Sequence, residues 1–326
     1  MNARTKPPSG RKTFSHLSRA RRLPTDYELL TTDLLWYPRF GGFEVDVPLA
    51  DWYARHQRGG GLRCDDWDRF ADPRETTYSK YVAIERARES YADGVMRAVE
   101  SRGYDASLPR EWVTALERVL PVVRFPSHAM QMLAAYVGQM APSGRIVVAC
   151  AFQAADHLRR VHRLTERSVQ LRRTHPGFGE AARASWEQER AWQPLREACE
   201  RAFVAWDWGE AFVAWNLCIG PLFDELLFGR LPEVAGHRGD PMLAAYFASF
   251  EEDGAWHREW TRALVGLALA ASDDNRGALQ RWLGAWMPRA RAAVRAMDGL
   301  LAPDSVVDGA ISAQAAWLAS MGLDPQ

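Results

Sequence analysis

From about residue 73 to its end, the sequence repeats apolar residues at helical spacing and interrupts them with prolines. In the first of these segments, one helix face is formed by Tyr81, Ile84, Arg88, Tyr91, Val95 and Ala98. Asp72 and Pro73 indicate where this helix begins, and Gly103 indicates where it ends. Helices with one apolar face and short connectors bury those faces against one another. Because no strand alternation follows residue 62, the sequence predicts an all-α helical bundle.

The same reasoning predicts further helices along the rest of the chain, most of them separated by proline. They are expected over 109–124, 127–140, 144–174, 180–190, 194–229, 240–271, 274–301 and 304–321. Pro221 falls inside one of these ranges and is expected to kink that helix.

The part of the chain before the bundle divides into two segments. Residues 1–25 are basic and lack an apolar period, which predicts an extended arm that orders on a partner. Residues 26–72 are expected to form an irregular segment that packs on the bundle, with short extended pieces at Tyr27–Tyr37 and Phe43–Val47. Residues 73–326 are expected to form the bundle domain itself.

Charge and cysteine content exclude several classes of function. Lysine plus arginine and aspartate plus glutamate both number 41, so neither nucleic-acid binding nor membrane-surface binding is expected as the main role. The basic N-terminus has no secretory apolar core, and the apolar stretch Ile146–Phe152 is too short to span a bilayer. The four cysteines form no C-x-x-C pair, so we expect neither a zinc site nor a disulfide framework, and a cytoplasmic location.

Two of the expected helices carry remnants of a metal-binding frame. They read Asp-His-Leu-Arg-Arg at 156–160 and Asp-Gly-Ala-Trp-His at 253–257. Carboxylate-bridged di-iron bundles use Asp-Glu-x-x-His, in which Glu and His share one helix face. Here His157 and Gly254 stand at the two Glu positions, and Arg160 replaces the first His. Only His257 remains of the four ligands, so the frames are degenerate.

The acid content of the first half of the bundle supports this interpretation. A di-iron site needs four carboxylates and two histidines from four helices. Residues 118–165 contain no Glu, and Asp156 is their only acid, so no intact metal site is expected on this chain. Glu210 lies where the second half of such a site draws its isolated Glu, but a Glu paired with an arginine or an indole N–H is the favoured interpretation.

Other sites are less well supported by the sequence. His128, His157 and His257 would have to converge to hold a single metal or a haem, and no spacing signature indicates this. A stand-alone metalloprotein with an unorthodox site around His157, Glu210 and His257 is the main alternative. A helical binding module without oxygenase chemistry is a third. No G-x-S-x-G, P-loop or G-x-G-x-x-G fingerprint is present.

Six short stretches, in order along the chain, match one known family. They are Lys12–Leu17, Pro24–Glu28, Leu49–Tyr53, Asp65–Asp72, Gln139–Ser143 and Asp207–Phe212. From about residue 11 to about residue 300 the chain resembles the β subunit of the hydroxylase of bacterial soluble multicomponent monooxygenases, closest to the toluene, benzene and alkene type.

This resemblance implies a ferritin-like fold of the ribonucleotide-reductase group and a β subunit paralogous to the iron-bearing α subunit. It implies no catalytic residue, cofactor or metal on this chain, and a di-iron centre in α. The hydroxylase would be a dimer of αβγ units that receives NADH-derived electrons through a flavin reductase and a Rieske ferredoxin, with a small effector protein docking on it. The complex would insert one oxygen atom of O₂ into a small aromatic or alkene hydrocarbon.

Large side chains in the arm and around residue 207 are the candidates for contact with partner subunits. These candidates are Phe14, His16, Leu17, Trp206 and Trp208.

Overall fold

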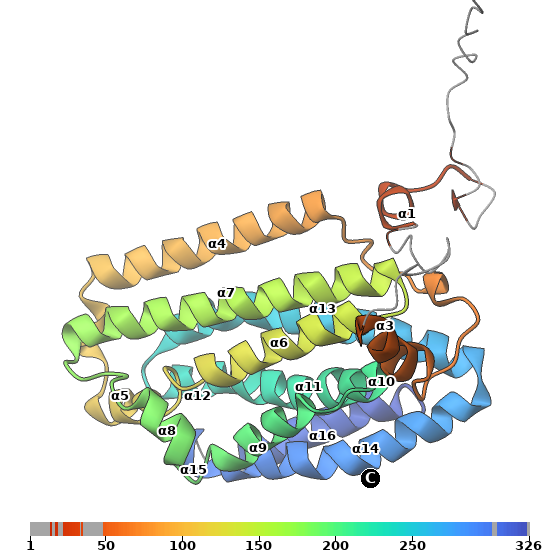
Figure 1. Ribbon diagram of the computed structural model, residues 1–326. Coiled ribbons are helices and arrows are strands. Elements are labelled where there is room, and N and C mark those ends of the chain that lie inside the picture. Colours follow the sequence, from red (N-terminus) through yellow and green to blue (C-terminus); the bar gives the residue numbers. More distant parts are fainter. Residues whose placement is uncertain are drawn as a thin grey trace, which may run out of the picture.

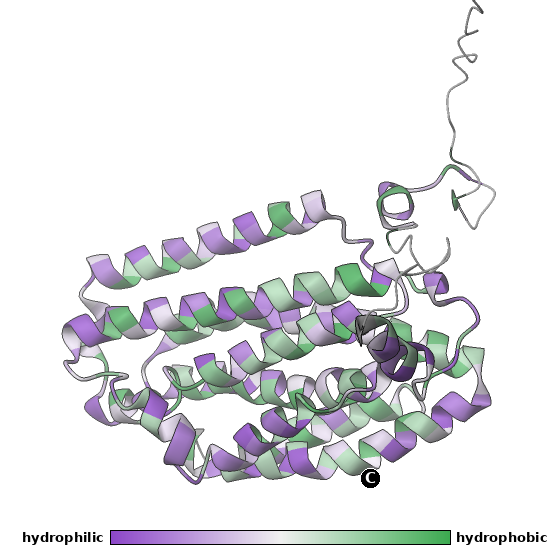
Figure 2. Ribbon diagram, viewed as in Figure 1, coloured by the Kyte–Doolittle hydropathy of each residue, from purple (hydrophilic) through white to green (hydrophobic). Residues whose placement is uncertain are grey.

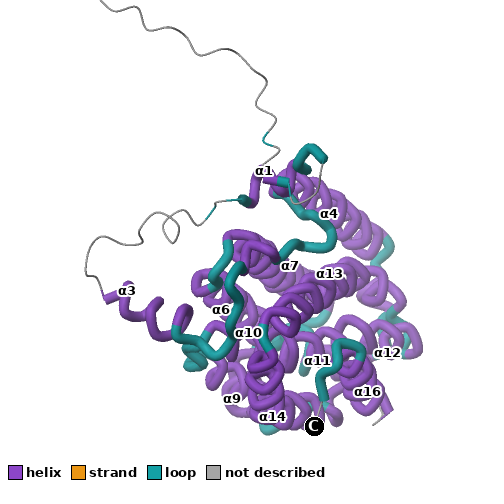
Figure 3. Tube along the Cα trace, turned by 90° about the vertical axis from the view of Figure 1, so that its right-hand side faces the viewer, coloured by secondary structure: helices purple, strands orange, loops and turns teal. Residues whose placement is uncertain are grey.

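The computed structural model describes residues 14, 17–18, 22–32, 34, 48–301 and 305–324. Every regular element in these residues is helical, which confirms the predicted all-α class (Figure 3). The α-helices are α1 (Asp26–Thr31), α3 (Pro48–Tyr53), α4 (Tyr78–Ser101), α5 (Arg110–Glu117), α6 (Arg124–Met140), α7 (Gly144–Thr174), α8 (Ala182–Gln188), α9 (Gln193–Ala202), α10 (Trp208–Phe212), α11 (Gly220–Asp224), α12 (Leu231–His237), α13 (Pro241–Ala271), α14 (Asp273–Ala296), α15 (Asp298–Leu301) and α16 (Ser305–Ala319).

Long helices running alongside one another form the bundle. Figure 1 shows α6, α7 and α13 beside the continuous run α10–α12, with α14 and α16 covering the opposite side. Helix α4 lies at the outer edge, next to α7 and α13 (Figures 1 and 3). Hydrophilic and hydrophobic residues alternate along α4, α7 and α14, as expected for helices with one buried face (Figure 2). The core between them is rich in large aromatic side chains, including fully buried Trp192, Trp215 and Trp260.

The run α10–α12 is a core helix. It extends without a break over Trp208–His237 and is long and apolar enough to cross a membrane, but 89% of its most apolar window is buried inside the protein. Two π-helical segments, Val213–Ile219 and Glu225–Arg230, interrupt its α-helical geometry. They flank Pro221, so the strain of a proline inside this helix is absorbed by local widening of the turns.

A side chain from α16 satisfies backbone groups at this distortion. Pro221 has no N–H, so the carbonyl of Leu217, four residues earlier, lacks its usual intrahelical donor. The buried Gln314 amide donates Nε2–H bonds of 2.8 Å to the carbonyls of Leu217 and Cys218. Gln314 therefore fastens the C-terminal helix to the core helix.

We expect Gln314→Leu to lower the free energy of unfolding by about 1–3 kcal/mol, because two buried carbonyls lose a donor. Urea unfolding followed by circular dichroism measures this difference. The exposed Ser312 on the same helix gives the matched control, and Ser312→Ala should change the value by less than about 0.5 kcal/mol. Equal effects of the two substitutions would contradict the role of the amide.

The segment before the bundle contains more helix than expected. Residues 26–31 form α1 instead of an extended piece, because Thr25 and Glu28 make a capping box. The Thr25 side chain accepts from the Glu28 N–H, and the Thr25 N–H donates to the Glu28 carboxylate at 2.8 Å. The other expected extended piece, 43–47, lies outside the described residues. A further helix and a π-helical turn occupy Pro48–Arg58.

Two expected helices end early. The helix expected over 109–124 stops at Glu117, because Pro121 cannot supply an N–H to the next turn. The helix expected over 194–229 is two helices: α9 ends at Ala202, and the next one begins after Asp207. The Asp207 carboxylate accepts from the N–H groups of Gly209 and Glu210, which caps the new helix.

Candidate functional site

The two degenerate frames meet in the interior, as their pattern predicts. Residues 156–160 lie on α7 and residues 253–257 on the neighbouring helix α13. Asp156 and Asp253 are both fully buried. Their carboxylates, together with that of Glu85 from α4, place oxygen atoms within 4.8 Å of one another. Three helices thus bring acids to one point in the core.

Asp156 is held by two neutral hydrogen-bond donors. The Tyr81 hydroxyl donates to Oδ1 of Asp156 at 2.7 Å, and Nε2 of His257 lies 2.8 Å from Oδ2. Burial lowers the pKa of His257 to about 3, with the charge of Arg160 as the next cause, so this imidazole is neutral. Burial raises the pKa of Asp156 to about 6, against the Tyr81 hydrogen bond and nearby arginines. At neutral pH the His257 Nε2–H therefore donates to an ionised Asp156.

Asp253 is neutralised by arginines on two helices. Nη1 of Arg88 donates to Oδ1 of Asp253 at 2.5 Å, and Nη2 of Arg159 donates to Oδ2. The same two arginines also contact Glu85, at 2.6 Å from Arg88 and 2.7 Å from Arg159. The guanidinium of Arg159 lies over the ring of Phe250. These contacts tie α4 to α7 and α13 through a partly buried ion-pair network.

Burial raises the pKa of Glu85 to about 7, and the neighbouring charge of Asp253 adds to this. The folded chain therefore binds a proton on Glu85 between pH 4.5 and 7, where the unfolded chain does not. The stability contributed by this proton is present below pH 4.5 and is lost as the pH rises through 7.

Replacing Glu85 with glutamine should remove this pH dependence. We expect the unfolding free energy of the native chain, minus that of Glu85→Gln, to fall between pH 4.5 and 7. The fall should approach about 1.4 kcal/mol for each unit by which the folded and unfolded pKa values differ. Urea titrations across this window measure it. A difference that stays constant with pH would contradict protonation of Glu85.

Arg160 crosses the bundle from α7 to the opposite helices. Its side chain is 0% exposed. Nη1 donates to Oδ1 of Asp224 at 2.8 Å, and Nη2 donates to the carbonyl of Phe250 at 2.9 Å. The guanidinium carbon lies 4.8 Å from the centre of the Phe228 ring. The position that would hold a metal-binding histidine thus holds a cation with its own carboxylate, carbonyl and aromatic face.

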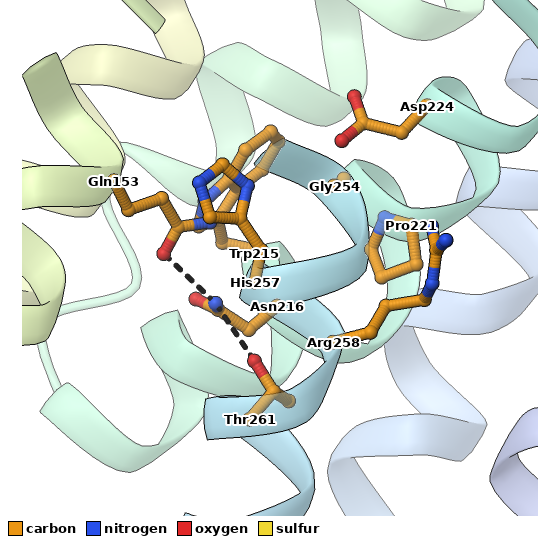
Figure 4. A pocket seen from close by; sticks show the side chains of 10 residues that line it. Gln153, Trp215, Asn216, Pro221, Asp224, Gly254, His257, Arg258 and Thr261 are labelled. Carbon is orange, nitrogen blue, oxygen red and sulfur yellow. Dashed lines mark hydrogen bonds between the residues drawn. The ribbon is translucent and has the colours of Figure 1, made fainter. Parts of the chain in front are cut away.

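Gly254 makes room for this arrangement. A Cβ atom at this position would lie 3.0 Å from Oδ2 of Asp224, closer than an ordinary van der Waals contact. The absence of a side chain at residue 254 therefore leaves room beside α13 for the Asp224 carboxylate, which accepts from Arg160. Figure 4 shows Asp224 near Gly254, and both line the small cavity that His257 also lines.

His157 acts as a neutral aromatic side chain here. It is fully buried, and its ring centre lies 5.2 Å from that of Trp215 and 5.5 Å from that of His257. Burial, with the charge of Arg160, holds the pKa of His157 well below its usual value. Neither ring nitrogen has a hydrogen-bond partner among the described residues.

The cavity beside these residues is small. It has a volume of about 10 Å³, enough for one water molecule at most. The polar side chains that line it are hydrogen-bonded to one another: the Asn216 amide donates to Gln153 at 3.0 Å and to Thr261 at 3.1 Å (Figure 4). A hydrocarbon substrate would not fit in this cavity.

The alternative ligand sets are not assembled. Glu210 accepts a 3.1 Å hydrogen bond from the indole N–H of Trp286, which confirms the favoured pairing, and it does not line the cavity beside His257. His128 is exposed on α6, so His128, His157 and His257 do not converge, in agreement with the absence of a spacing signature for them. The spacing of these histidines in the sequence could not show this, because they lie on different helices.

The residues present do not fit a di-iron centre. Arg160 and Gly254 offer no ligand atom, and the carboxylates of Glu85 and Asp253 already face arginine side chains. Two cations bound by the same oxygens would have to displace these guanidinium groups.

Several residues of the network were not predicted from the sequence as residues of the site. They are Tyr81, Glu85, Arg88, Arg159 and Asp224. A weak signal existed for Tyr81 and Arg88, since both fall on the predicted buried face of the first long helix, where an arginine needs a buried acid. Asp224 carries no such signal.

The candidate interface residues have mixed outcomes. Trp208 is 1% exposed and packs edge-on against Trp67, so its selection as an interface residue is wrong. Trp206 is 41% exposed and packs edge-on against Trp52. Phe14 is exposed and Leu17 is half-buried, whereas His16 lies outside the described residues.

Comparison with known proteins connects this architecture to enzyme components. A family model for methane, phenol and alkene hydroxylases matches residues 36–272. The β subunit of the hydroxylase component of the toluene-4-monooxygenase system from Ectopseudomonas mendocina is 33% identical over 299 residues, which cover 90% of this chain and 91% of the relative. The phenol 2-monooxygenase oxygenase component DmpL from Pseudomonas sp. (strain CF600) is 28% identical over 268 residues. The alignment covers 80% of this chain and 79% of that relative.

A solved structure gives the same result. A chain of toluene 4-monooxygenase, with toluene bound in the resting active site, superposes with a TM-score of 0.85 at 33% identity. The alignment covers 92% of this chain and 99% of that chain.

Proposed function

Because the chain belongs to the methane/phenol/alkene hydroxylase family, we propose that it is the non-catalytic β subunit of a multicomponent di-iron monooxygenase hydroxylase. The complex oxidises a small aromatic or alkene hydrocarbon with O₂ and electrons from NADH. One observation carries the non-catalytic role: the buried guanidinium of Arg160 occupies a ligand position and is bonded to Asp224. A metal at that position would lack the histidine ligand and would lie against a buried positive charge.

The chain supports a larger, iron-bearing α subunit in this proposal. A small γ subunit completes the unit, and two αβγ units form the hydroxylase in the cytoplasm. An effector protein and a Rieske ferredoxin bind the complex transiently. The similarity over 91% of a relative named as a hydroxylase β subunit supports this assignment, and the exposed Trp206 and Phe14 are the candidates for subunit contacts. Balanced charge gives no reason to include nucleic acid or membrane among the partners.

The stand-alone metalloprotein loses its support in the geometry. Its three proposed ligands do not converge, since Glu210 bonds to Trp286 while His257 bonds to Asp156.

Metal content and assembly test the proposal together. We expect the chain to co-purify with a larger iron protein when the neighbouring genes are expressed with it. Separated from that partner and reconstituted with ferrous iron, the chain should hold no stoichiometric iron and should not hydroxylate toluene or phenol. Elemental analysis after gel filtration measures the metal. Two irons per isolated chain would overturn the non-catalytic role, and a stable chain that captures no partner would overturn the subunit role.

A further inference from the structure

The interior around the degenerate frames has an excess of buried acid that needs compensation. Asp156, Asp253 and Asp224 are buried, and Glu85 joins them from α4. A buried carboxylate is costly unless a cation or several donors face it. In a metal-containing bundle the ions fill this role. Here Tyr81 and His257 donate to Asp156, and arginine side chains face the other three acids.

Arg160 is the arginine that lies deepest. Arg88 and Arg159 reach the acids from the side of α4, and each retains partial exposure. Arg160 is completely enclosed, and its contacts come from two helices: Asp224 and the Phe228 ring lie on the continuous run α10–α12, and the Phe250 carbonyl lies on α13.

This set of contacts selects a planar organic cation over a metal ion. A carboxylate and a carbonyl oxygen accept from two different nitrogens of the guanidinium, 2.8 and 2.9 Å away. The Phe228 ring, with its centre 4.8 Å from the guanidinium carbon, offers a face that attracts a weakly hydrated cation. A divalent metal prefers oxygen or nitrogen ligands on all sides and gains nothing from the ring.

We propose that Asp224, the Phe250 carbonyl and the Phe228 ring form a built cation site whose occupant is the chain's own Arg160 guanidinium. This guanidinium replaces the metal as the positive charge that joins α7 to α11 and α13. Gly254 is part of the same cation site, because a Cβ atom at this position would lie only 3.0 Å from the Asp224 carboxylate.

The site should therefore accept a free guanidinium ion once its own is removed. Arg160→Ala deletes the cation and leaves an enclosed space lined by the Asp224 carboxylate, the Phe250 carbonyl and the Phe228 ring. An oxygen of Asp253, which lies 3.9 Å from Nε of the native Arg160, is also close to this space. The full-length chain, purified with its partner subunits, is melted with and without guanidinium chloride at millimolar concentration, below the denaturing range. Sodium chloride at the same ionic strength and urea at the same concentration are the controls. Urea has nearly the same shape but no charge.

We expect Arg160→Ala to melt roughly 10 °C below the native chain and to recover at least about 3 °C in guanidinium chloride. Sodium chloride and urea should not restore it. The native chain and the double variant Arg160→Ala/Asp224→Asn should gain nothing from guanidinium. Guanidinium rescue no larger in Arg160→Ala than in the native chain would overturn the assignment, as would equal rescue by urea or stronger rescue by manganese or ferrous iron.

If Arg160→Ala does not accumulate as folded protein, Arg160→Lys tests the same site. An ammonium group retains the charge but does not bridge Asp224 and the Phe250 carbonyl while lying on Phe228. The melting temperature should fall by roughly 5 °C or more. An unchanged value would overturn the requirement for a planar cation.

The inference rests on the proposed non-catalytic role, and the two can fail separately. Iron bound stoichiometrically to the isolated native chain would contradict the role. Absence of guanidinium rescue would contradict only the cation site.

Discussion

Asp253→Ala is expected to lower the free energy of unfolding by about 3–5 kcal/mol. The substitution removes the carboxylate that faces both Arg88 and Arg159 and leaves two guanidinium groups in the interior without their main partner. Urea or thermal unfolding of the purified chain measures the loss.

The neighbouring residue provides a close control. Glu252 lies on the same helix and also contacts Arg88, at 3.2 Å, but its side chain is 69% exposed. Glu252→Ala should change the free energy of unfolding by about 0.5 kcal/mol or less. If the two alanine variants are equally stable, the buried Asp253 carboxylate does not contribute more to the free energy of unfolding than the exposed Glu252 does.

Gly254→Glu is expected to cost about 3–5 kcal/mol, although it returns the residue that a metal-binding frame would have. The new Cβ would press on the Asp224 carboxylate, and the new carboxyl group would enter a buried region beside another acid. Thermal and urea unfolding measure the loss, and it should persist when ferrous iron is added.

Smaller substitutions on α13 separate the steric part of this effect. Gly254→Ala should cost about 1–2 kcal/mol because of the contact with Asp224. Gly266 lies on the same helix with nothing within 4 Å of its added Cβ, so Gly266→Ala should stabilise the chain by about 0.5–1 kcal/mol. A stabilising effect of alanine at both positions would show that residue 254 has free space.

Helices with strong apolar periodicity and clear ends were predictable from the sequence. The range expected for 144–174 coincides with α7, and that for 240–271 nearly coincides with α13, whose N-cap is Asp240. Ser143 supplies the cap of α7, and a capped, proline-bounded segment fixes both its type and its limits.

Errors arose where a local hydrogen bond outweighed the apolar pattern. The capping box of Thr25 and Glu28 turns six residues into a helix, where an extended segment was expected. Asp207 similarly starts a new helix inside an apolar run, and its other oxygen also accepts from the N–H of Gly61 at 2.7 Å. The capping box of Thr25 and Glu28 was visible in the sequence. The contact between Asp207 and Gly61 was not, because it joins residues far apart in the chain.

The loss of metal ligands at the candidate site could be predicted from the sequence. The ion pair that takes their place could not. The sequence places Arg160 and Gly254 at ligand positions because helical spacing fixes which residues share a face. The partner of Arg160 is Asp224, which comes from a helix distorted by π-turns and carries no metal-binding pattern. Which acid a buried arginine meets depends on packing between helices, and one sequence does not specify it.

The covalent attachment of Arg160 has a consequence for how the subunit matures. A metal that stabilises a bundle does so in proportion to its free concentration, and chelators or scarcity remove that contribution. A guanidinium on the chain itself cannot diffuse away, so the junction between α7, α11 and α13 closes as soon as the helices pack. In the proposed complex, cells short of iron would still produce this chain in its final fold, and metal delivery would limit only the proposed iron-bearing subunit.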